Sequence, residues 1–157
     1  MGIITFHNGG MSRRGFDPAT FAWEGVSARP YKDEPGAARG MGWRGIARTT
    51  LVRGPLEVRY FEVAPGGFSS LEKHEHTHAV FAVRGHGRAL VGSSVVELAP
   101  LDLVETAPFE PHRWVNAGEE PFGFICTVSG ERDRPQPLSD AEWDALARDP
   151  VTAPLVY

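Results

Sequence analysis

Residues 66–85 read GGFSSLEKHEHTHAVFAVRG, and the pattern in this stretch is the strongest guide to the fold. Side chains that can bind a metal occur at every second position, namely Glu72, His74, His76 and His78. In a β-strand, residues two apart point to the same face of the sheet. Such residues are also about 6.5–7 Å apart along the strand, so four of them cannot reach one ion from a straight strand. We therefore expect a bend that takes one residue out, and His76 is the candidate.

The sequence on both sides of this stretch predicts a β-rich body. Short runs of strand-forming residues are separated by glycine, proline or acidic turns, with no helix-length pattern between them. The expected strands cover residues 43–53, 55–64, 67–73, 77–84, 88–92, 94–98, 102–106, 112–116 and 121–129. So many short strands in one domain favour a sandwich or barrel.

The chain divides into three segments around one domain. Its length of 157 residues suits a single compact core. Residues 1–41 form an irregular N-terminal arm, residues 42–130 the barrel, and residues 131–157 a C-terminal tail. Within the tail, residues 139–142 read SDAE, a capping box that predicts the start of a short helix.

Composition excludes several functional classes. Acidic residues outnumber basic ones by 20 to 16, so the net charge of −4 does not favour nucleic acid or an acidic membrane surface. The single cysteine, Cys126, excludes an intrachain disulfide and zinc motifs built on paired thiolates. No apolar run approaches the roughly 18 residues of a transmembrane helix. We expect a cytoplasmic protein without nucleic-acid or membrane partners.

Residues 66–85 resemble the first signature of the cupin superfamily. That signature has a glycine, a histidine six positions later, a second histidine after one residue, a glutamate after three or four more, and a closing glycine. Gly66, His74 and Gly85 match it here. Glu72 stands at the position of the first histidine, and His78 stands at the position of the glutamate. The spacing fits without a gap, and two identities are exchanged.

A second cupin signature is matched more loosely by residues 102–116. Pro108, His112 and Asn116 fall in place, whereas Asp102 and Glu110 replace the two glycines of the signature. Together the two signatures extend the resemblance over roughly residues 55–130.

The resemblance implies an all-β fold, a double-stranded β-helix of the cupin or jelly-roll type, with a metal in its interior. The implied ligands are Glu72, His74, His78 and His112. Three imidazoles and one carboxylate suit one divalent first-row transition metal, such as Fe, Mn, Ni, Co, Cu or Zn. Such a site leaves one or two positions for water, dioxygen or substrate. Glu72 is expected either as a ligand or as a catalytic general base.

The remaining candidates divide between the pocket and the surface. If His112 points inward, so does Trp114, and strand residues Arg48, Arg59 and Tyr60 are candidates to bind a carboxylate or phenolate substrate. His76 either replaces Glu72 as a ligand or lies in a solvent-facing loop. Further histidines, His7 in the arm and His86 between two glycines, are expected away from the site. Cys126 is expected in the core, with a thiol in the pocket as the alternative.

The function that the resemblance implies is a metal-dependent enzyme acting on a small organic molecule, with a dioxygenase-type oxidoreductase favoured. An isomerase, decarboxylase or lyase using the same site is the alternative, as is a non-catalytic module that binds a metal or small ligand. Aromatic residues in the arm, including Phe21, Trp23 and Tyr31, suggest that it pairs with a second subunit in a homodimer.

Overall fold

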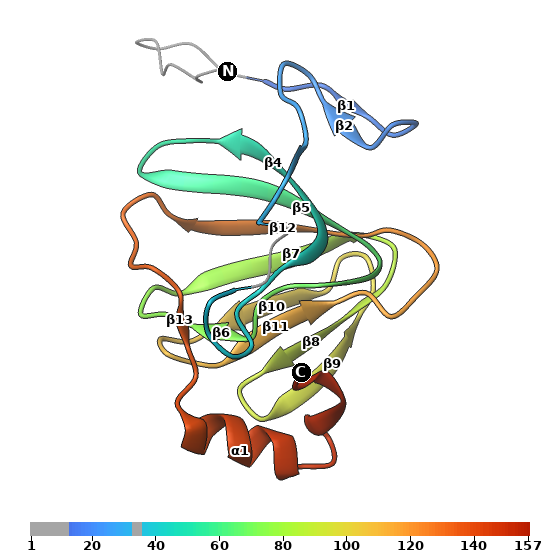
Figure 1. Cartoon of the computed structure of the whole chain (residues 1–157). Coiled ribbons are helices and arrows are strands. Elements are labelled where there is room, and N and C mark those ends of the chain that lie inside the picture. The colour runs from blue at the N-terminus through green and yellow to red at the C-terminus, as the bar shows by residue number, and fades with distance from the viewer. Residues whose placement is uncertain (1–12, 33–35) are drawn as a thin grey trace.

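The computed structural model describes residues 13–32 and 36–157, so His7 and part of the expected arm lie outside the described residues. The described chain is mostly β-structure (Figure 1). Its elements are β1 (Phe16–Asp17), β2 (Ala22–Trp23), β3 (Arg29–Pro30), β4 (Arg44–Val52), β5 (Leu56–Phe68), β6 (Glu72–Lys73), β7 (His78–Arg84), β8 (Gly87–Val91), β9 (Ser94–Leu98), β10 (Leu103–Thr106), β11 (His112–Val115), β12 (Phe122–Ser129), β13 (Gln136–Pro137), α1 (Asp140–Arg148) and the 3₁₀ turn η1 (Ala153–Leu155).

The main sheet is antiparallel and curls around an interior, which confirms the expected all-β barrel architecture. Its order is β10-β7-β12-β5-β11-β6-β13, with β4 also on β5 and the β8–β9 hairpin on β11. Figure 1 shows α1 below the barrel and the β1–β2 hairpin at the opposite end. Within the described residues, no helix is both long and apolar enough to cross a membrane.

The long strand β5 differs from the expected pattern. Two strands were expected, with a break near Pro65, but β5 runs without interruption from Leu56 to Phe68. Gly66 has a φ of 75°, a conformation that glycine adopts without steric cost, so the strand bends here instead of ending. The following strand, β6, contains only two residues and places Glu72 opposite His112 on β11.

Two apolar clusters hold the elements together. One fills the barrel and includes Phe61, Phe122 and Phe124. The other lies between the sheet and the C-terminal segment and includes Trp143 and Leu146 of α1. Burying such side chains is the main favourable term in folding.

Helix α1 begins with the expected capping box. The Ser139 hydroxyl accepts a hydrogen bond from the Glu142 amide, and the Glu142 carboxylate accepts one from the Ser139 amide. The same carboxylate forms an ion pair with Lys73 of β6, whose Nζ lies 2.7 Å from Oε1. The helix is thereby connected to the strand that carries Glu72.

Arg113 holds the C-terminal segment from inside the protein. Its side chain is fully buried and donates hydrogen bonds only to main-chain oxygens. Nε donates to Ser69 at 2.9 Å, Nη1 to Leu155 and Tyr157 at 3.0 and 2.8 Å, and Nη2 to Gly40 at 3.3 Å. Each nitrogen of this buried guanidinium therefore has a partner.

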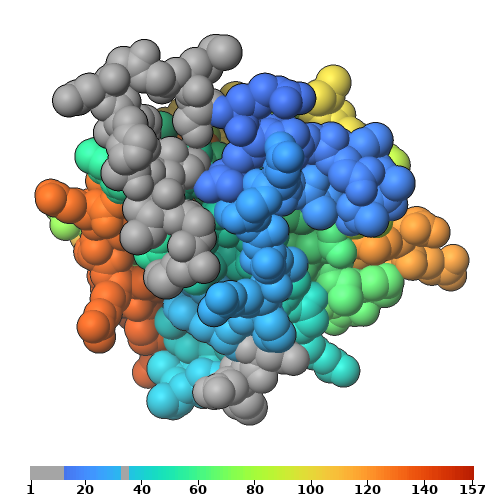
Figure 2. All heavy atoms as spheres, turned by 90° about the horizontal axis from the view of Figure 1, so that it is seen from above, coloured from blue at the N-terminus to red at the C-terminus, as the bar shows by residue number. Residues whose placement is uncertain are grey.

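The aromatic residues of the arm pack on the same chain. Phe21 and Trp23 contact Tyr60 of β5 at ring-centroid distances of 5.4 and 4.9 Å, and Tyr31 contacts Phe61 at 5.3 Å. Figure 2 shows the β1–β2 hairpin lying across one end of the barrel. Phe21, Trp23 and Tyr31 thus pack against the barrel of their own chain, and the homodimer stays a prediction.

Candidate metal centre

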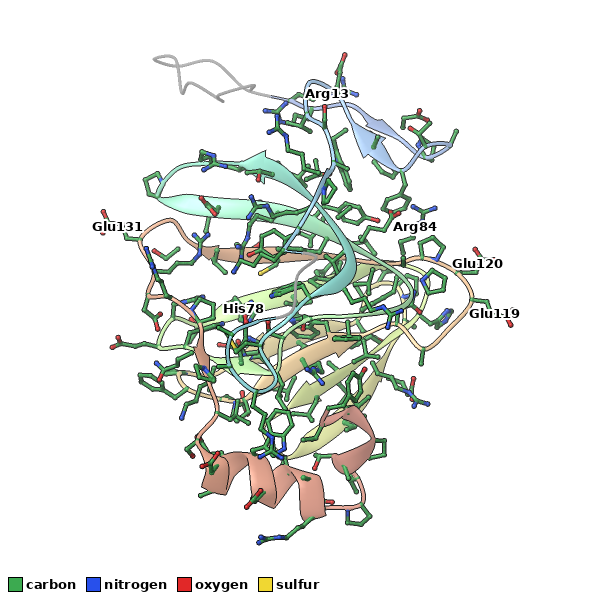
Figure 3. All side chains as sticks on the ribbon, in the orientation of Figure 1. Arg13, His78, Arg84, Glu119, Glu120 and Glu131 are labelled. Atoms are coloured by element: carbon green, nitrogen blue, oxygen red, sulfur yellow. The ribbon has the colours of Figure 1, made fainter. Side chains whose placement is uncertain are left out.

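Three histidines from separate elements meet inside the barrel. His78 begins β7, His112 begins β11, and His74 lies directly after β6. All three are buried, and each offers a nitrogen so that these atoms lie within 4.8 Å of one another. Figure 3 shows His78 inside the barrel, while Arg84 at the other end of β7 lies beside the β1–β2 hairpin. The three imidazoles form a candidate metal site.

The hydrogen bonds of these rings leave one nitrogen of each available. Nδ1 of His74 donates to the His76 carbonyl at 2.7 Å, and Nδ1 of His112 donates to the Glu110 carbonyl at 2.9 Å. Because a carbonyl can only accept, both Nδ1 atoms carry the proton and both Nε2 atoms keep a lone pair. His78 has Nδ1 on Cys126 Sγ at 3.1 Å, and its buried Nε2 has no partner. This orientation of the rings through Nδ1 fits a bound metal.

Burial also keeps these imidazoles neutral, the form that binds metal. Desolvation lowers the pKa of His112 to about 4, and it lowers the pKa of His78 further, with the neighbouring imidazoles adding to the effect. Desolvation lowers the pKa of His74 in the same direction. At neutral pH none of the three rings needs to lose a proton before it can bind a metal.

Glu72 lies on the wall of the same cavity. Glu72 is 7% exposed, and its Oε2 has no hydrogen-bond partner. Burial raises the pKa of Glu72 to about 7, against the opposing effect of Lys32. Among the described residues, the group of ligand atoms within 4.8 Å contains the three imidazoles and does not extend to Glu72. The roles expected for Glu72, ligand or base, stay predictions.

His76 lies in the bend that was expected between the two strands. Its ring stacks on His74 with a centroid distance of 3.6 Å, and its Nδ1 contacts Asp133 at 2.7 Å. Asp133 also accepts hydrogen bonds from the amides of Glu75 and His76. His74, His76 and Asp133 form a second group of ligand atoms within 4.8 Å. His76 therefore lies in the expected loop, partly buried between exposed neighbours, and outside the group of three central imidazoles.

A cavity of about 380 Å³ opens over these side chains. Trp114 lines it, as the sequence predicts, together with Phe61 and Phe124. Its charged lining includes both signs: Lys32, Glu57, Arg59, Glu72, Arg132, Asp133 and Arg134. Arg132 is paired with Glu57 at 2.9 Å, which leaves Lys32, Arg59 and Arg134 as the cations available to an anionic ligand.

Cys126 and Arg59 face this cavity from neighbouring strands. They are cross-strand partners on β12 and β5, and Arg59 Nη2 donates to Cys126 Sγ at 3.3 Å. Arg59 Nε is buried without a partner. Desolvation raises the pKa of the Cys126 thiol, and the Arg59 charge opposes that shift. Cys126 thus lies at the edge of the apolar core with its sulfur against polar groups of the site.

Two residues expected in the pocket lie elsewhere. Successive side chains of β5 point to opposite faces of the sheet, and Arg59 and Phe61 line the cavity. Tyr60, which lies between them, therefore points to the other face, where it packs against Phe21 and Trp23. Arg48 is opposite Phe61 in the register, but its guanidinium stacks on the ring of Tyr31, which separates it from the cavity. Neither residue is among the described residues that line the site.

A curled antiparallel sheet with three histidines converging in its interior defines the class of protein. The chain belongs to the cupin family, and residues 59–128 match the Cupin domain. The sequence resemblance to small single-domain cupins is thereby confirmed.

The chain is also similar to particular members of that family. It is 39% identical over 136 residues to a protein of Rhodospirillum rubrum named 1-methylthio-D-xylulose 5-phosphate methylsulfurylase, with 85% of each chain covered. Among solved structures, a cupin 2 conserved barrel domain protein from Rhodopseudomonas palustris has 36% identity and a TM-score of 0.80, covering 92% of this chain and 99% of its own. A cupin-2 domain protein from Rhodospirillum rubrum has 35% identity and a TM-score of 0.77, covering 92% and 95%.

Proposed function

We propose that this chain is a metal-dependent enzyme that removes the methylthio group from a small phosphorylated ketose. The substrate class comes from the name of the Rhodospirillum rubrum relative, which is 39% identical over 85% of both chains. The observation that carries the proposal is the cavity, because it combines three imidazoles with three cations, Lys32, Arg59 and Arg134, for which no ion pair is found among the described residues.

The two parts of the cavity suit the two ends of such a substrate. His74, His78 and His112 would hold a divalent first-row metal, which supplies Lewis-acid polarisation of substrate oxygens when bound. Arg59 offers a buried Nε that lacks a partner, with Lys32 and Arg134 on the same lining. Charge-assisted hydrogen bonds from these cations suit a phosphate group.

Glu72 provides a proton-transfer group beside the imidazoles. Because burial raises its pKa to about 7, the protonated and ionised forms are both accessible near neutral pH. Its buried Oε2, which has no partner in the protein, would hold a proton for the carbon next to the ketone or remove one from it. This assignment gives Glu72 a catalytic role whether or not it also contacts the metal.

A dioxygenase-type oxidoreductase is the second candidate. The donor set of three imidazoles with a nearby carboxylate also suits iron chemistry, and the aromatic lining suits an apolar organic substrate. The cations on the lining favour the phosphorylated substrate over this one.

The experiment compares these functions on one preparation. Protein reconstituted with each divalent first-row ion is incubated without oxygen with 1-methylthio-D-xylulose 5-phosphate and a small thiol. We expect loss of the methylthio group at about one metal per chain. Oxygen uptake without that loss, on a panel of other organic substrates, would support the dioxygenase, and binding without any turnover would support a binding module.

A matched pair of variants tests the site itself. His112→Ala removes a ring from the centre, whereas His86→Ala removes an exposed ring in the turn after β7. We expect the first variant to lose its metal and the second to keep it. Full metal content in both variants would contradict the site assignment.

A further inference from the structure

We propose that Cys126 is the catalytic residue that receives the methylthio group, forming a mixed disulfide that a second thiol then resolves. The inference rests on the proposed function, because it names the acceptor for that reaction. It also assigns a role to Cys126, one of the residues that line the cavity.

The position of the sulfur supports this role. Cys126 Sγ lies 3.1 Å from His78 Nδ1 and 3.3 Å from Arg59 Nη2, so it is held between an imidazole of the candidate metal centre and a cavity cation. A substrate bound between the candidate metal centre and Arg59 Nε would therefore lie close to this sulfur. An inert core cysteine would instead be surrounded by apolar side chains.

The atoms around the thiol point independently to a ligand. Arg59 Nε, His78 Nε2 and Glu72 Oε2 are buried without any hydrogen-bond partner. These three side chains are 8%, 8% and 7% exposed, and all of them line the cavity of about 380 Å³. Buried polar groups are almost always paired, and a metal would complete only His78 Nε2, so Arg59 Nε and Glu72 Oε2 indicate that a polar ligand also enters this cavity. Two of the three belong to the residues that hold the sulfur.

The chemistry balances with one further reactant. Cys126 Sγ attacks the sulfur of the methylthio group, and an S–S bond forms while the bond from that sulfur to C1 of the ketose breaks. The electron pair moves to C1, next to the ketone, and C1 takes the proton that the thiol gives up. C1 is thereby reduced by two electrons, and the two sulfur atoms are oxidised to a disulfide. A low-molecular-weight thiol then attacks that disulfide, restores Cys126 and leaves as a mixed disulfide with the methylthio group.

The test uses the metal-reconstituted full chain without added thiol. We expect one equivalent of product per chain and a protein mass increase equal to one CH₃S group replacing one hydrogen. The chain has a single cysteine, so a disulfide adduct of this mass must be on Cys126. Addition of dithiothreitol should remove the adduct and start repeated turnover.

Two variants of β12 provide the comparison. Cys126→Ser should form no adduct and should lower the turnover rate by at least about a hundredfold, with metal content unchanged. Thr127→Ser, the adjacent residue on the other face of the strand, should behave as the unsubstituted protein. If Cys126→Ser fails to fold, the adduct and the single equivalent of product in the unsubstituted protein decide the question.

The outcomes separate this inference from the proposed function. Turnover with thiol but no adduct, or full activity in Cys126→Ser, would overturn the role of Cys126 and leave the proposed function standing. Repeated turnover without any added thiol would do the same. No conversion of the methylthio substrate by any metal form, even with thiol, would overturn both.

Discussion

The two buried arginines of this barrel, Arg113 and Arg59, have opposite surroundings. Arg113 donates from all its side-chain nitrogens to main-chain oxygens, and these hydrogen bonds connect the C-terminal segment to the sheet. Arg59 donates one hydrogen bond, to the Cys126 sulfur, lies over the ring of Phe61 and has a buried Nε without a partner. Both side chains are at least nine-tenths buried, so exposure does not separate them.

What separates them is whether the fold itself supplies the hydrogen-bond partners. A buried polar group that the chain satisfies contributes to stability, whereas one that the chain leaves unsatisfied costs stability until a ligand arrives. Arg113 belongs to the first kind, and Arg59, His78 and Glu72 belong to the second. The predictions below test this division through effects of opposite sign.

The largest expected effect on stability comes from replacing Arg113, whose hydrogen-bond partners the chain itself supplies. Arg113→Met would leave buried carbonyl oxygens without donors and release the C-terminal segment, so we expect the free energy of unfolding to fall by about 3–5 kcal/mol. Urea denaturation measures this change. Arg88→Met is the control, because Arg88 forms an exposed ion pair with Glu97 whose loss should cost less than about 1 kcal/mol. Equal losses of stability in the two variants would contradict the prediction that the hydrogen bonds of Arg113 stabilise the fold more than an exposed ion pair does.

The next effect should have the opposite sign. Burial raises the pKa of Glu72 from 4.5 to about 7, so its contribution to stability is fully present below pH 4.5 and is lost as the pH rises through 7. In the metal-free protein, Glu72→Gln should therefore increase stability by roughly 2–3 kcal/mol at pH 8 and by little at pH 4.5. The buried histidines affect both proteins alike, so the difference in urea midpoint isolates Glu72. A stability loss at pH 8 would contradict this prediction.

Replacement of the unsatisfied arginine should affect binding more than folding. Arg59→Met should change the free energy of unfolding by about 1 kcal/mol or less, since the chain supplies it with few partners. We expect the KM for the phosphorylated substrate to rise by roughly ten- to a hundredfold, from loss of a charge-assisted contact. Arg84→Met, which removes a cation outside the cavity, should leave the KM unchanged. A lower kcat with an unchanged KM would contradict a role of Arg59 in binding the phosphate group.

The smallest effect concerns the outer side of β6. Glu142→Gln weakens the capping box of α1 and the ion pair with Lys73, so we expect a loss of about 1 kcal/mol in thermal or urea denaturation. Asp144→Asn, on the exposed side of the same helix, is the matched control with a smaller loss. A change in Glu142→Gln no larger than that of the control would show that the helix start contributes little.

Spacing along the chain was enough to predict the three histidines that meet at the candidate metal site. His74 and His78 occur in one short segment, and their separation fixes a strand and a bend, while His112 follows from a second motif. The barrel follows from the turn residues that divide its strands. Residue spacing and turn residues depend only on short segments of the chain, so they can be read from one sequence.

Contacts between distant segments could not be predicted in this way. Cys126 and Arg59 are 67 positions apart, and their contact depends on the register of β5 against β12. Asp133 meets His76 from 57 positions away, through a tail with no recognisable pattern. Tyr60 was expected on the wrong side of its strand because parity alone does not say which of two alternating sets faces inward.

The two-residue strand β6 has a practical consequence for redesign of this protein. Glu72 faces the cavity, and Lys73, the next residue, is anchored to the start of α1 outside the barrel. A substitution at the beginning of the helix can therefore shift a carboxylate inside the site without touching any residue that lines it. Anyone selecting variants for a new substrate should expect useful changes to appear on the surface at α1, and should include that helix in the mutated region.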